Sequence, residues 1–235
     1  MEAKDRIIVA LDVDNLDKAA SLVENLAPYV GCFKVGLELL TAVGAPKVVE
    51  FIHSFGGQVF YDGKFDDIPN TVGAAAKVVA AMNVKMFNVH ASAGVEAMMA
   101  AVANKGRSLV LAVTVLTSLE ENNVHLIFGG PSKAKVLQFT RDAKIAGCDG
   151  VICSPQELGL LGKQKELGEL LKVTPGVRPE WTTADDQKRI MTPAEAIMAG
   201  ADALVIGRPI TKPPAEIGTP VDAAKKIAEE ISSVL

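Results

Sequence analysis

The densest group of chemically active residues in this sequence is the segment Asp62-Gly63-Lys64-Phe65-Asp66-Asp67-Ile68-Pro69, which places four charges within six residues. It follows an apolar run, and the two-residue period of a strand puts Asp62 and Lys64 on one side. An ammonium group between carboxylates keeps its proton, so the spacing favours a site that holds Lys64 as a cation. The alternative is an ion-pair cluster in a loop, or a helix start at which acidic residues are favourable.

Other polar residues stand at the ends of further apolar runs. They are Asp12, Lys34, His90, Thr117, Ser154, Pro175 with Gly176, and Gly207 with Arg208. A lysine inside an apolar run such as CFKVGL is rarely buried without a partner. His90 is expected to be a hydrogen-bonded structural residue rather than a general base. Arg208 carries the planar donor fork that suits a phosphate group.

These residues need a scaffold that brings strand ends together. Apolar runs predict strands at Arg6–Asp12, Cys32–Leu37, Gln58–Lys64, Lys85–His90, Ser108–Leu116, Gly150–Ser154, Leu171–Val177 and Ala203–Ile210. Helical spacing predicts helices at Leu16–Leu26, Thr71–Ala81, Val95–Ala103, Ala134–Ala146 and Asp222–Ile231, and one that begins at Thr192-Pro193 and stops at Gly200. Continuous apolar runs suit strands buried on both faces, and repeated strand–helix units imply parallel strands with right-handed crossovers.

Eight such units predict an α/β fold, the eight-stranded parallel (β/α)8 or TIM barrel, with its active site at the C-terminal ends of the strands. An open doubly wound sheet is disfavoured because no glycine follows the first run at Asp12-Val13-Asp14.

The composition is that of an ordinary globular protein, with 235 residues, 49% hydrophobic and 22% charged, and a net charge of -4. No Lys/Arg-rich run indicates nucleic-acid binding, and no stretch of about 18 apolar residues predicts a membrane span. We expect one catalytic domain over residues 1–235, located in the cytoplasm, with no nucleic-acid or membrane partner. The three cysteines form no CxxC pair, and no His/Cys/Asp/Glu set has metal-ligand spacing, so neither a disulfide framework nor a metal site is expected.

Motifs spread over nearly the whole chain are shared with one enzyme family. They are ALD at Ala10–Asp12, FKVG at Phe33–Gly36, DGKFDDIPNT at Asp62–Thr71, NVHA at Asn88–Ala91, LTS at Leu116–Ser118, TPGVR at Thr174–Arg178, DQ at Asp186-Gln187 and VIGRPIT at Val205–Thr211. By these motifs the sequence resembles the orotidine 5'-monophosphate decarboxylase family. Two positions depart from the family's common pattern, because Gly63 stands where Leu is usual and Asp66 where His is usual.

The resemblance implies an enzyme that converts orotidine 5'-monophosphate to uridine 5'-monophosphate, the last step of de novo pyrimidine nucleotide synthesis, without metal or organic cofactor. No electron sink holds the charge left on the ring carbon, so the barrier must fall by something on the order of 20 kcal/mol. By resemblance, Lys64 protonates that carbon and Asp62 lies against the departing carboxylate, while Lys34 and Asp67 complete an alternating charge network.

The resemblance also implies which residues bind the substrate. They are Asp12, Ile68, Thr71, Thr117, Pro175, Arg178, Gln187, Gly207 and Arg208. Asp12 is expected to bind the ribose hydroxyls. Thr117 and Gln187 are expected to contact the pyrimidine amide edge and the phosphate region. Gly207 and Arg208 are expected to bind the phosphate, and the loop from residue 175 to 187 is expected to close over the site as a lid.

A second subunit is implied as well. In the family, the residues that match Asp67, Ile68 and Thr71 reach into the neighbouring subunit's site. We therefore expect a homodimer with active sites shared across a two-fold interface.

Two other functions remain open. Keto-gulonate-phosphate decarboxylases and hexulose-phosphate synthases share the D-x-K-x-x-D motif, but use a magnesium ion held partly by an acid where this sequence has Lys34. A non-catalytic barrel that only senses a nucleotide would not need the crowded charges of Asp62, Lys64 and Asp67. Activity that survives a chelator would exclude the magnesium-dependent enzymes. Turnover in a substrate assay would exclude the non-catalytic barrel.

Overall fold

Eight parallel strands close into one barrel in the order of the chain. The computed structural model describes residues 1–182 and 191–235. The strands are β1 (Ile7–Ala10), β2 (Cys32–Val35), β3 (Val59–Phe65), β4 (Met86–His90), β5 (Leu109–Val113), β6 (Gly150–Ile152), β7 (Leu171–Pro175) and β8 (Ala203–Ile206). β8 pairs with β1 and completes the circle, which confirms the predicted (β/α)8 barrel.

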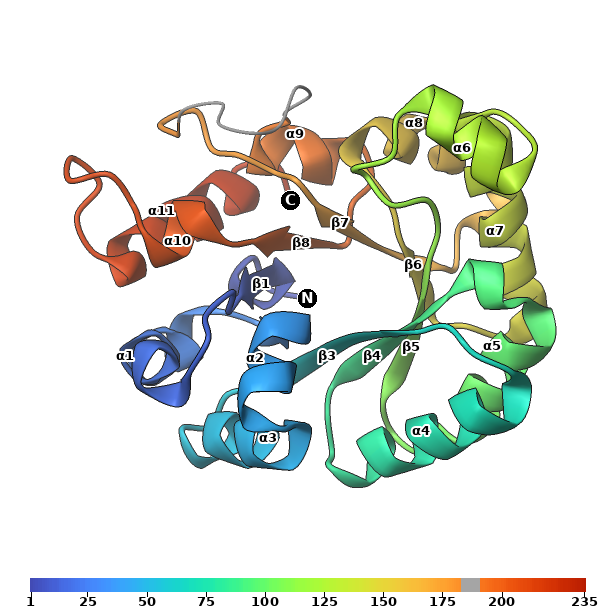
Figure 1. Cartoon of the computed structure of the whole chain (residues 1–235). Coiled ribbons are helices and arrows are strands. Elements are labelled where there is room, and N and C mark those ends of the chain that lie inside the picture. The colour runs from blue at the N-terminus through green and yellow to red at the C-terminus, as the bar shows by residue number, and fades with distance from the viewer. Residues whose placement is uncertain (183–190) are drawn as a thin grey trace.

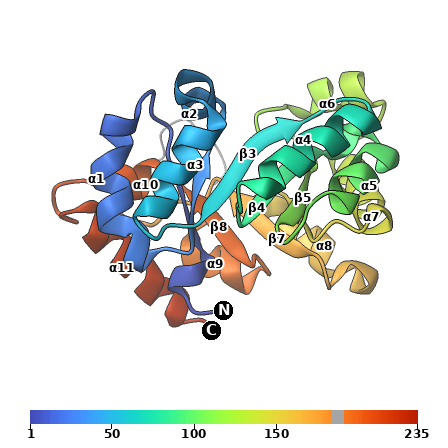
Figure 2. The same cartoon turned by 90° about the horizontal axis from the view of Figure 1, so that it is seen from below.

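Helices follow the strands around the outside of the barrel in chain order (Figure 1). They are α1 (Leu16–Leu26), α2 (Leu37–Val43), α3 (Ala45–Ser54), α4 (Pro69–Ala81), α5 (Val95–Ala103), α6 (Glu121–Phe128), α7 (Ser132–Ala146), α8 (Leu158–Gly162), α9 (Pro193–Met198), α10 (Arg208–Thr211) and α11 (Pro220–Ser232). Short 3₁₀ turns occur at η1 (Lys4–Arg6), η2 (Ala27–Tyr29), η3 (Ala91–Ala93), η4 (Pro155–Glu157) and η5 (Lys165–Leu167). The chain ends lie near each other, where α11 packs against η1 (Figure 2).

The helix boundaries have local causes that the sequence carries. The Asn15 side chain accepts a hydrogen bond of 2.9 Å from the Lys18 backbone N–H and so starts α1. Thr192 and Glu195 form a reciprocal capping box at the start of α9. The bounds predicted for α1 and α5 are confirmed, and the other predicted helices lie within two residues of those observed.

Several regions differ from the prediction, and α6 and α8 are among the helices that were not predicted. The last run was expected to stay extended to Ile210, but β8 ends at Ile206 and Arg208–Thr211 forms α10. Pro209 lacks an N–H for the strand ladder, and its fixed φ suits the first turn of a helix. In addition, α2 and α3 were not predicted as helices. They meet at Gly44, whose φ of 90° lies in the region that favours glycine.

Apolar side chains fill both the inside of the barrel and the layer between strands and helices. The barrel interior is lined by Ile8, Ala10, Cys32, Phe60, Met86, Leu111, Val173, Ala203 and Val205. A larger cluster joins the outer strand faces to the helices. Among the described residues, no helix combines the length and apolar character that crossing a membrane requires.

Candidate active site

The inner wall of the barrel changes from apolar to charged at the carboxyl ends of the strands. Side chains alternate along a strand, so the residue two positions after an inward-facing one also faces inward. The inward-facing residues Ala10, Cys32, Phe60 and Met86 are followed two positions later by Asp12, Lys34, Asp62 and Asn88. The barrel thus gathers polar side chains from neighbouring strands above an apolar floor.

The Asp62 carboxylate is the centre of this cluster. Only 6% of the residue is exposed. Its Oδ1 lies 2.6 Å from Lys64 Nζ, and its Oδ2 lies 3.2 Å from Lys34 Nζ. Asn88 Nδ2 donates a further hydrogen bond of 2.6 Å to Oδ1. Lys34 Nζ also lies 3.2 Å from Asp12 Oδ1, so the charges alternate from Asp12 through Lys34 and Asp62 to Lys64.

These partners decide the ionisation of Asp62. Burial on its own would raise the pKa of the carboxyl group, but the Lys34 and Lys64 ammonium groups and the hydrogen bonds from Lys64 and Asn88 hold that pKa below its ordinary value. The group is therefore an anion at neutral pH. The sequence-based prediction that Lys34 would have a partner is confirmed, and so is the predicted proximity of Asp62 and Lys64.

The backbone that brings Lys64 to Asp62 is not the regular strand that the prediction assumed. The register of β3 with β4 pairs Tyr61 with Phe87 and Phe65 with Val89, so β3 advances four residues while β4 advances two. Lys64 lies in this irregularity with a φ of 50°. A left-handed conformation costs a non-glycine residue about 1–2 kcal/mol. The contact between Asp62 and Lys64 therefore depends on a bulge rather than on strand alternation.

Two glycines near the cluster stand where a Cβ would crowd a neighbouring side chain. A Cβ on Gly36 would lie 3.0 Å from Lys34 Nζ and 3.9 Å from carboxylate oxygens of both Asp12 and Asp62. At Gly63, where the family usually has Leu, a Cβ would collide with the Tyr61 ring. Neither role was predicted, although the FKVG motif does contain Gly36.

His90 lies at the end of β4, beside the cluster. Burial lowers the pKa of His90, with a further lowering by Lys64, while Asp66 and Asp62 act in the opposite direction. The net effect is a pKa below the ordinary value, so the imidazole is neutral at pH 7. Asp66, the residue that replaces the usual His, is thus close enough to act on His90.

Three predicted site residues are not part of this cluster. Asp67, Ile68 and Thr71 are exposed at the start of α4, and 65% of Ile68 is accessible. Asp67 Oδ1 accepts a hydrogen bond of 2.7 Å from the Ile68 backbone N–H. Within the described part of one chain, no ion pair joins Asp67 to either lysine.

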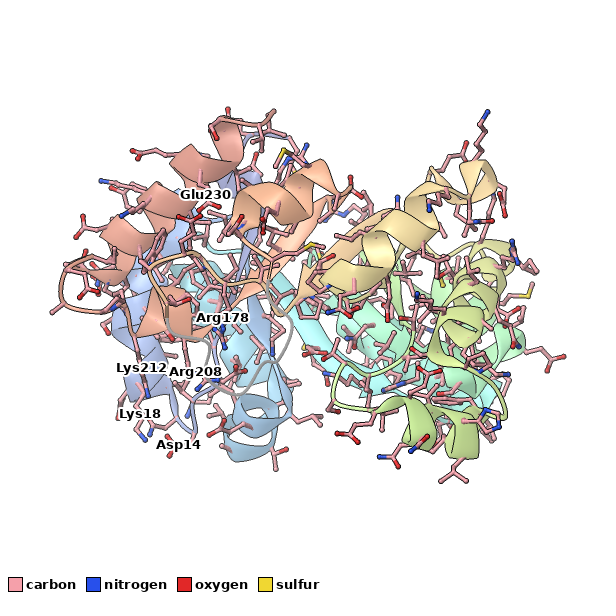
Figure 3. The ribbon with its side chains drawn as sticks, turned by 90° about the horizontal axis from the view of Figure 1, so that it is seen from above. Asp14, Lys18, Arg178, Arg208, Lys212 and Glu230 are labelled. Atoms are coloured by element: carbon pink, nitrogen blue, oxygen red, sulfur yellow. The ribbon has the colours of Figure 1, made fainter. Side chains whose placement is uncertain are left out.

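A second group of predicted residues lies where β7 and β8 end. Pro175 pairs with Val205, so the segment with Arg178 and the segment with Gly207 and Arg208 leave the barrel side by side. Figure 3 shows Arg178 and Arg208 on this side of the molecule. Arg208 is exposed and begins α10, whereas Arg178 is half-buried.

The two remaining predicted residues, Thr117 and Gln187, have no described contact with either group. Thr117 is exposed in the segment that follows β5. Gln187 lies outside the described residues, as does the whole segment between Thr182 and Met191. The structure therefore brings together Asp12, Lys34, Asp62 and Lys64, and separately the residues at the ends of β7 and β8.

A cavity of about 560 Å³ lies at the opposite face of the barrel. Residues that precede β3, β4 and β5 line it, among them His53, Lys85 and Arg107. Because a barrel's reacting groups belong to the carboxyl ends of its strands, we place the candidate active site at the charged cluster. Among the described residues, no group of three His, Cys, Asp or Glu side chains could hold a metal ion.

The fold is a closed parallel (β/α)8 barrel that holds a carboxylate between two lysines at the carboxyl ends of its strands. Residues 5–227 match the sequence profile of the Orotidine 5'-phosphate decarboxylase / HUMPS family. The chain belongs to this family.

Named relatives match the chain over its whole length. Orotidine 5'-phosphate decarboxylase of Heliobacterium modesticaldum is 48% identical over 247 residues, covering 100% of this chain and 99% of its own. That of Geotalea daltonii is 48% identical over 238 residues, covering 98% of this chain and 97% of its own. The crystal structure of orotidine 5'-phosphate decarboxylase from Lactobacillus acidophilus is 33% identical with a TM-score of 0.78, covering 96% of this chain and 98% of its own.

We predict that Asp62 makes the stability of the protein depend on acid pH. Its lowered pKa gives a contribution that is present above the unfolded-state value of about 3.9 and is lost as pH falls through the lower folded-state value. Asp62→Asn should lower the free energy of unfolding at pH 7 by about 3 kcal/mol, because it takes away the anion between two lysines. This difference from the parent should shrink as the pH falls toward about 3.

Urea denaturation of both proteins across this pH range measures the difference. Glu24→Gln, which removes an exposed carboxylate on α1, is the control for the loss of one acidic group. If the free energies of unfolding of the parent and Asp62→Asn differ by the same amount at every pH, the prediction is wrong.

Proposed function

We propose that this protein decarboxylates orotidine 5'-monophosphate to uridine 5'-monophosphate, with neither a metal ion nor an organic cofactor. The observation that carries the proposal is the Lys64 ammonium group, 2.6 Å from Asp62 at the carboxyl end of the barrel. The relatives that match the whole chain bear the name of this activity. The reaction would complete the de novo synthesis of the pyrimidine nucleotide.

The mechanism follows from the order of the charges. With the nucleotide bound, its carboxylate would lie against Asp62, and the repulsion between the two anions would raise the energy of the bound substrate. The bond between ring carbon and carboxylate breaks, carbon dioxide leaves, and the electron pair stays on the ring carbon. Lys64 supplies a fixed positive charge where that negative charge develops. The ammonium group then gives its proton to the carbon, and the amine regains one from water.

Lys34 has a different part in this scheme. Its ammonium group bridges Asp12 and Asp62 at 3.2 Å on each side, and it helps to keep the Asp62 carboxylate ionised. This arrangement favours the nucleotide enzyme over its magnesium-dependent relatives, because Lys34 already neutralises the carboxylates that a metal ion at this strand end would require. Asp12, which is exposed beyond Lys34, is suited to accept hydrogen bonds from the ribose hydroxyls.

The ends of β7 and β8 would hold the phosphate group. Barrels of this class commonly bind phosphate here, and the guanidinium of Arg208 matches its geometry. Pro175, Arg178 and Gly207 would shape the same subsite, and Thr117 and Gln187 would contact the base and the phosphate region. Binding energy from the phosphate, far from the reacting carbon, can drive closure and positioning.

We also propose a homodimer with shared active sites. The support is that Asp67, Ile68 and Thr71 are exposed in the single chain, although they belong to the same motif as Asp62 and Lys64. A large exposed side chain such as Ile68 would be covered by a second subunit. Asp67 would then complete the charge network of the neighbouring site, and Ile68 and Thr71 would contact its substrate.

Two further expectations accompany this function. Residues 1–235 are proposed to act as one catalytic domain, since all eight strands belong to one barrel. A cytoplasmic location remains a prediction. In its favour, Cys32, Cys148 and Cys153 are buried and free, and burial raises the pKa of each thiol to about 12. Unpaired cysteines suit a reducing compartment.

The first test is the loss of orotidine 5'-monophosphate absorbance in excess chelator. The parent should turn over, and Lys64→Ala should reduce kcat by more than about 1,000-fold while nucleotide affinity changes little. Lys77→Ala, which removes an exposed lysine on α4, is the control. Residual turnover within about tenfold of the parent would rule out Lys64 as the proton donor. Activity only on a sugar phosphate with magnesium would reassign the protein to the related enzymes.

Arg208→Ala should weaken the affinity for uridine 5'-monophosphate by about 10- to 100-fold, because charge-assisted hydrogen bonds are lost. The affinity for uridine, which lacks the phosphate, should hardly change. Calorimetric titration of both ligands gives the comparison, and Arg107→Ala, an exposed arginine at the opposite face, is the control. An equal loss for both ligands would disprove the phosphate contact.

Mixing Lys64→Ala with Asp67→Asn tests the shared site. Each variant alone should be nearly inactive. In a mixed dimer, one of the two sites combines an intact Lys64 with an intact Asp67, so random exchange should restore activity to about a quarter of the sites. Sedimentation of the parent gives the assembly state. If two inactive proteins exchange subunits and remain inactive, Asp67 does not act across the interface.

A further inference from the structure

Asn88 is a fully buried polar residue in the middle of β4, and its side chain is hydrogen-bonded at both ends. None of its surface is exposed. Its Nδ2 donates 2.6 Å to Asp62 Oδ1, and its Oδ1 accepts 2.7 Å from the Lys64 backbone N–H. One amide thus contacts both members of the Asp62–Lys64 pair, from a different strand.

The bulge in β3 makes this double contact possible. Tyr61 pairs with Phe87 and Phe65 with Val89, so residues 62 to 64 all lie opposite Asn88 alone. In a regular register, each would face its own neighbour on β4. Lys64 has an unusual φ of 50°, and its backbone N–H has no regular strand partner. The side-chain oxygen of Asn88 accepts the hydrogen bond from this N–H.

We propose that Asn88 is a positioning residue, whose amide fixes the Asp62 carboxylate and the strained Lys64 backbone relative to each other and thereby sets the direction of the Lys64 ammonium group. The inference rests on the proposed decarboxylation, in which the ammonium group must meet a ring carbon at a defined place. A displacement of about 1 Å in such a group can cost about 100-fold in rate.

The contact requires a side chain that offers both a donor and an acceptor. A neutral Asn or Gln side chain offers a donor and an acceptor side by side, whereas an ionised carboxylate offers only acceptors and an aliphatic side chain neither. Gln is longer by one methylene group, which would not fit a fully buried space without displacement. The charged or titratable groups that face this contact are Lys34 on β2, Lys64 on β3, and His90 on β4 together with Asp66.

Asn88→Ala removes both hydrogen bonds. We expect kcat for orotidine 5'-monophosphate to fall by about 100-fold and KM to change by less than about threefold, because no substrate contact is removed. Ser108→Ala is the matched control. Ser108 is 2% exposed, and its hydroxyl donates 2.7 Å to the Val84 carbonyl at the opposite end of the barrel. The control should lose stability in thermal unfolding, because it also removes a buried hydrogen bond, but it should keep its kcat.

Asn88→Asp tests the two halves of the contact separately. The introduced carboxylate still accepts from the Lys64 N–H, but it repels Asp62, and two adjacent carboxylates do not both ionise readily. At low pH the introduced group is protonated and can donate to Asp62, which restores the parent's hydrogen-bond pattern. The ratio of variant kcat to parent kcat should therefore fall as the pH rises from about 5 to about 9.

Three results would overturn the inference. The first is a kcat of Asn88→Ala within about threefold of the parent. The second is a decrease in kcat no larger for Asn88→Ala than for Ser108→Ala. The third is a ratio of Asn88→Asp kcat to parent kcat that stays constant across the pH range. If Asn88→Ala does not fold, the pH series of Asn88→Asp decides alone.

A separate measurement keeps the inference distinguishable from the proposed function. If the parent shows no turnover, the decarboxylase assignment fails, and the carboxyl carbon resonance of Asp62 then reports on the contact directly. Titration of that resonance should show a higher pKa for Asp62 in Asn88→Ala than in the parent, because a hydrogen bond to the anion is lost. An unchanged pKa would overturn the role of Asn88.

Discussion

One carboxylate between two ammonium groups is the constraint on which the rest of the site depends. Unit charges about 4 Å apart attract by about 4 kcal/mol at the dielectric constant typical near a protein surface. The buried Asp62 carboxylate depends most on such attraction, because little water reaches it. Asp62 is 6% exposed, and it stays ionised because Lys34 and Lys64 flank it and Asn88 donates a hydrogen bond to it. The same row gives the site its chemistry, since each charge is already oriented before a substrate arrives and little reorganisation is needed.

The barrel is what makes such a row possible. Lys34 comes from β2 and Asp62 from β3, and Asp12 follows β1, so the parallel strands place three side chains in one layer through the alternation of inward and outward residues. The apolar layer below, which includes Cys32 and Phe60, keeps water from reaching the charges from inside the barrel. Electrostatic interactions strengthen where water is excluded, so packing in the barrel interior contributes directly to the strength of the site.

The sequence was sufficient for the parts that depend on periodicity and residue type. Eight apolar runs gave the strand number, and Asp62, Lys64 and Lys34 were recognisable as polar residues at strand ends. The bulge at Lys64 was not predictable, because nothing in residue type signals a lysine with positive φ. Asn88 was missed as a site residue although it interrupts an apolar run at an inward-facing position. Asp67 could be placed only by resemblance, since its predicted contacts involve a second chain.

The pairing of β1 with β8 has a consequence for how this protein is made. Val9 pairs with Ile206, so the segments that carry Asp12 and Arg208, nearly 200 residues apart in the chain, become neighbours only when the circle closes. Contacts of such high sequence separation form slowly, because loop-closure entropy opposes them. During synthesis on the ribosome, the first seven strands must wait with an open edge on β1 until the last one emerges. Until this closure, β1 keeps an unpaired edge, and the residues at the ends of β1 and β8 cannot act as one site.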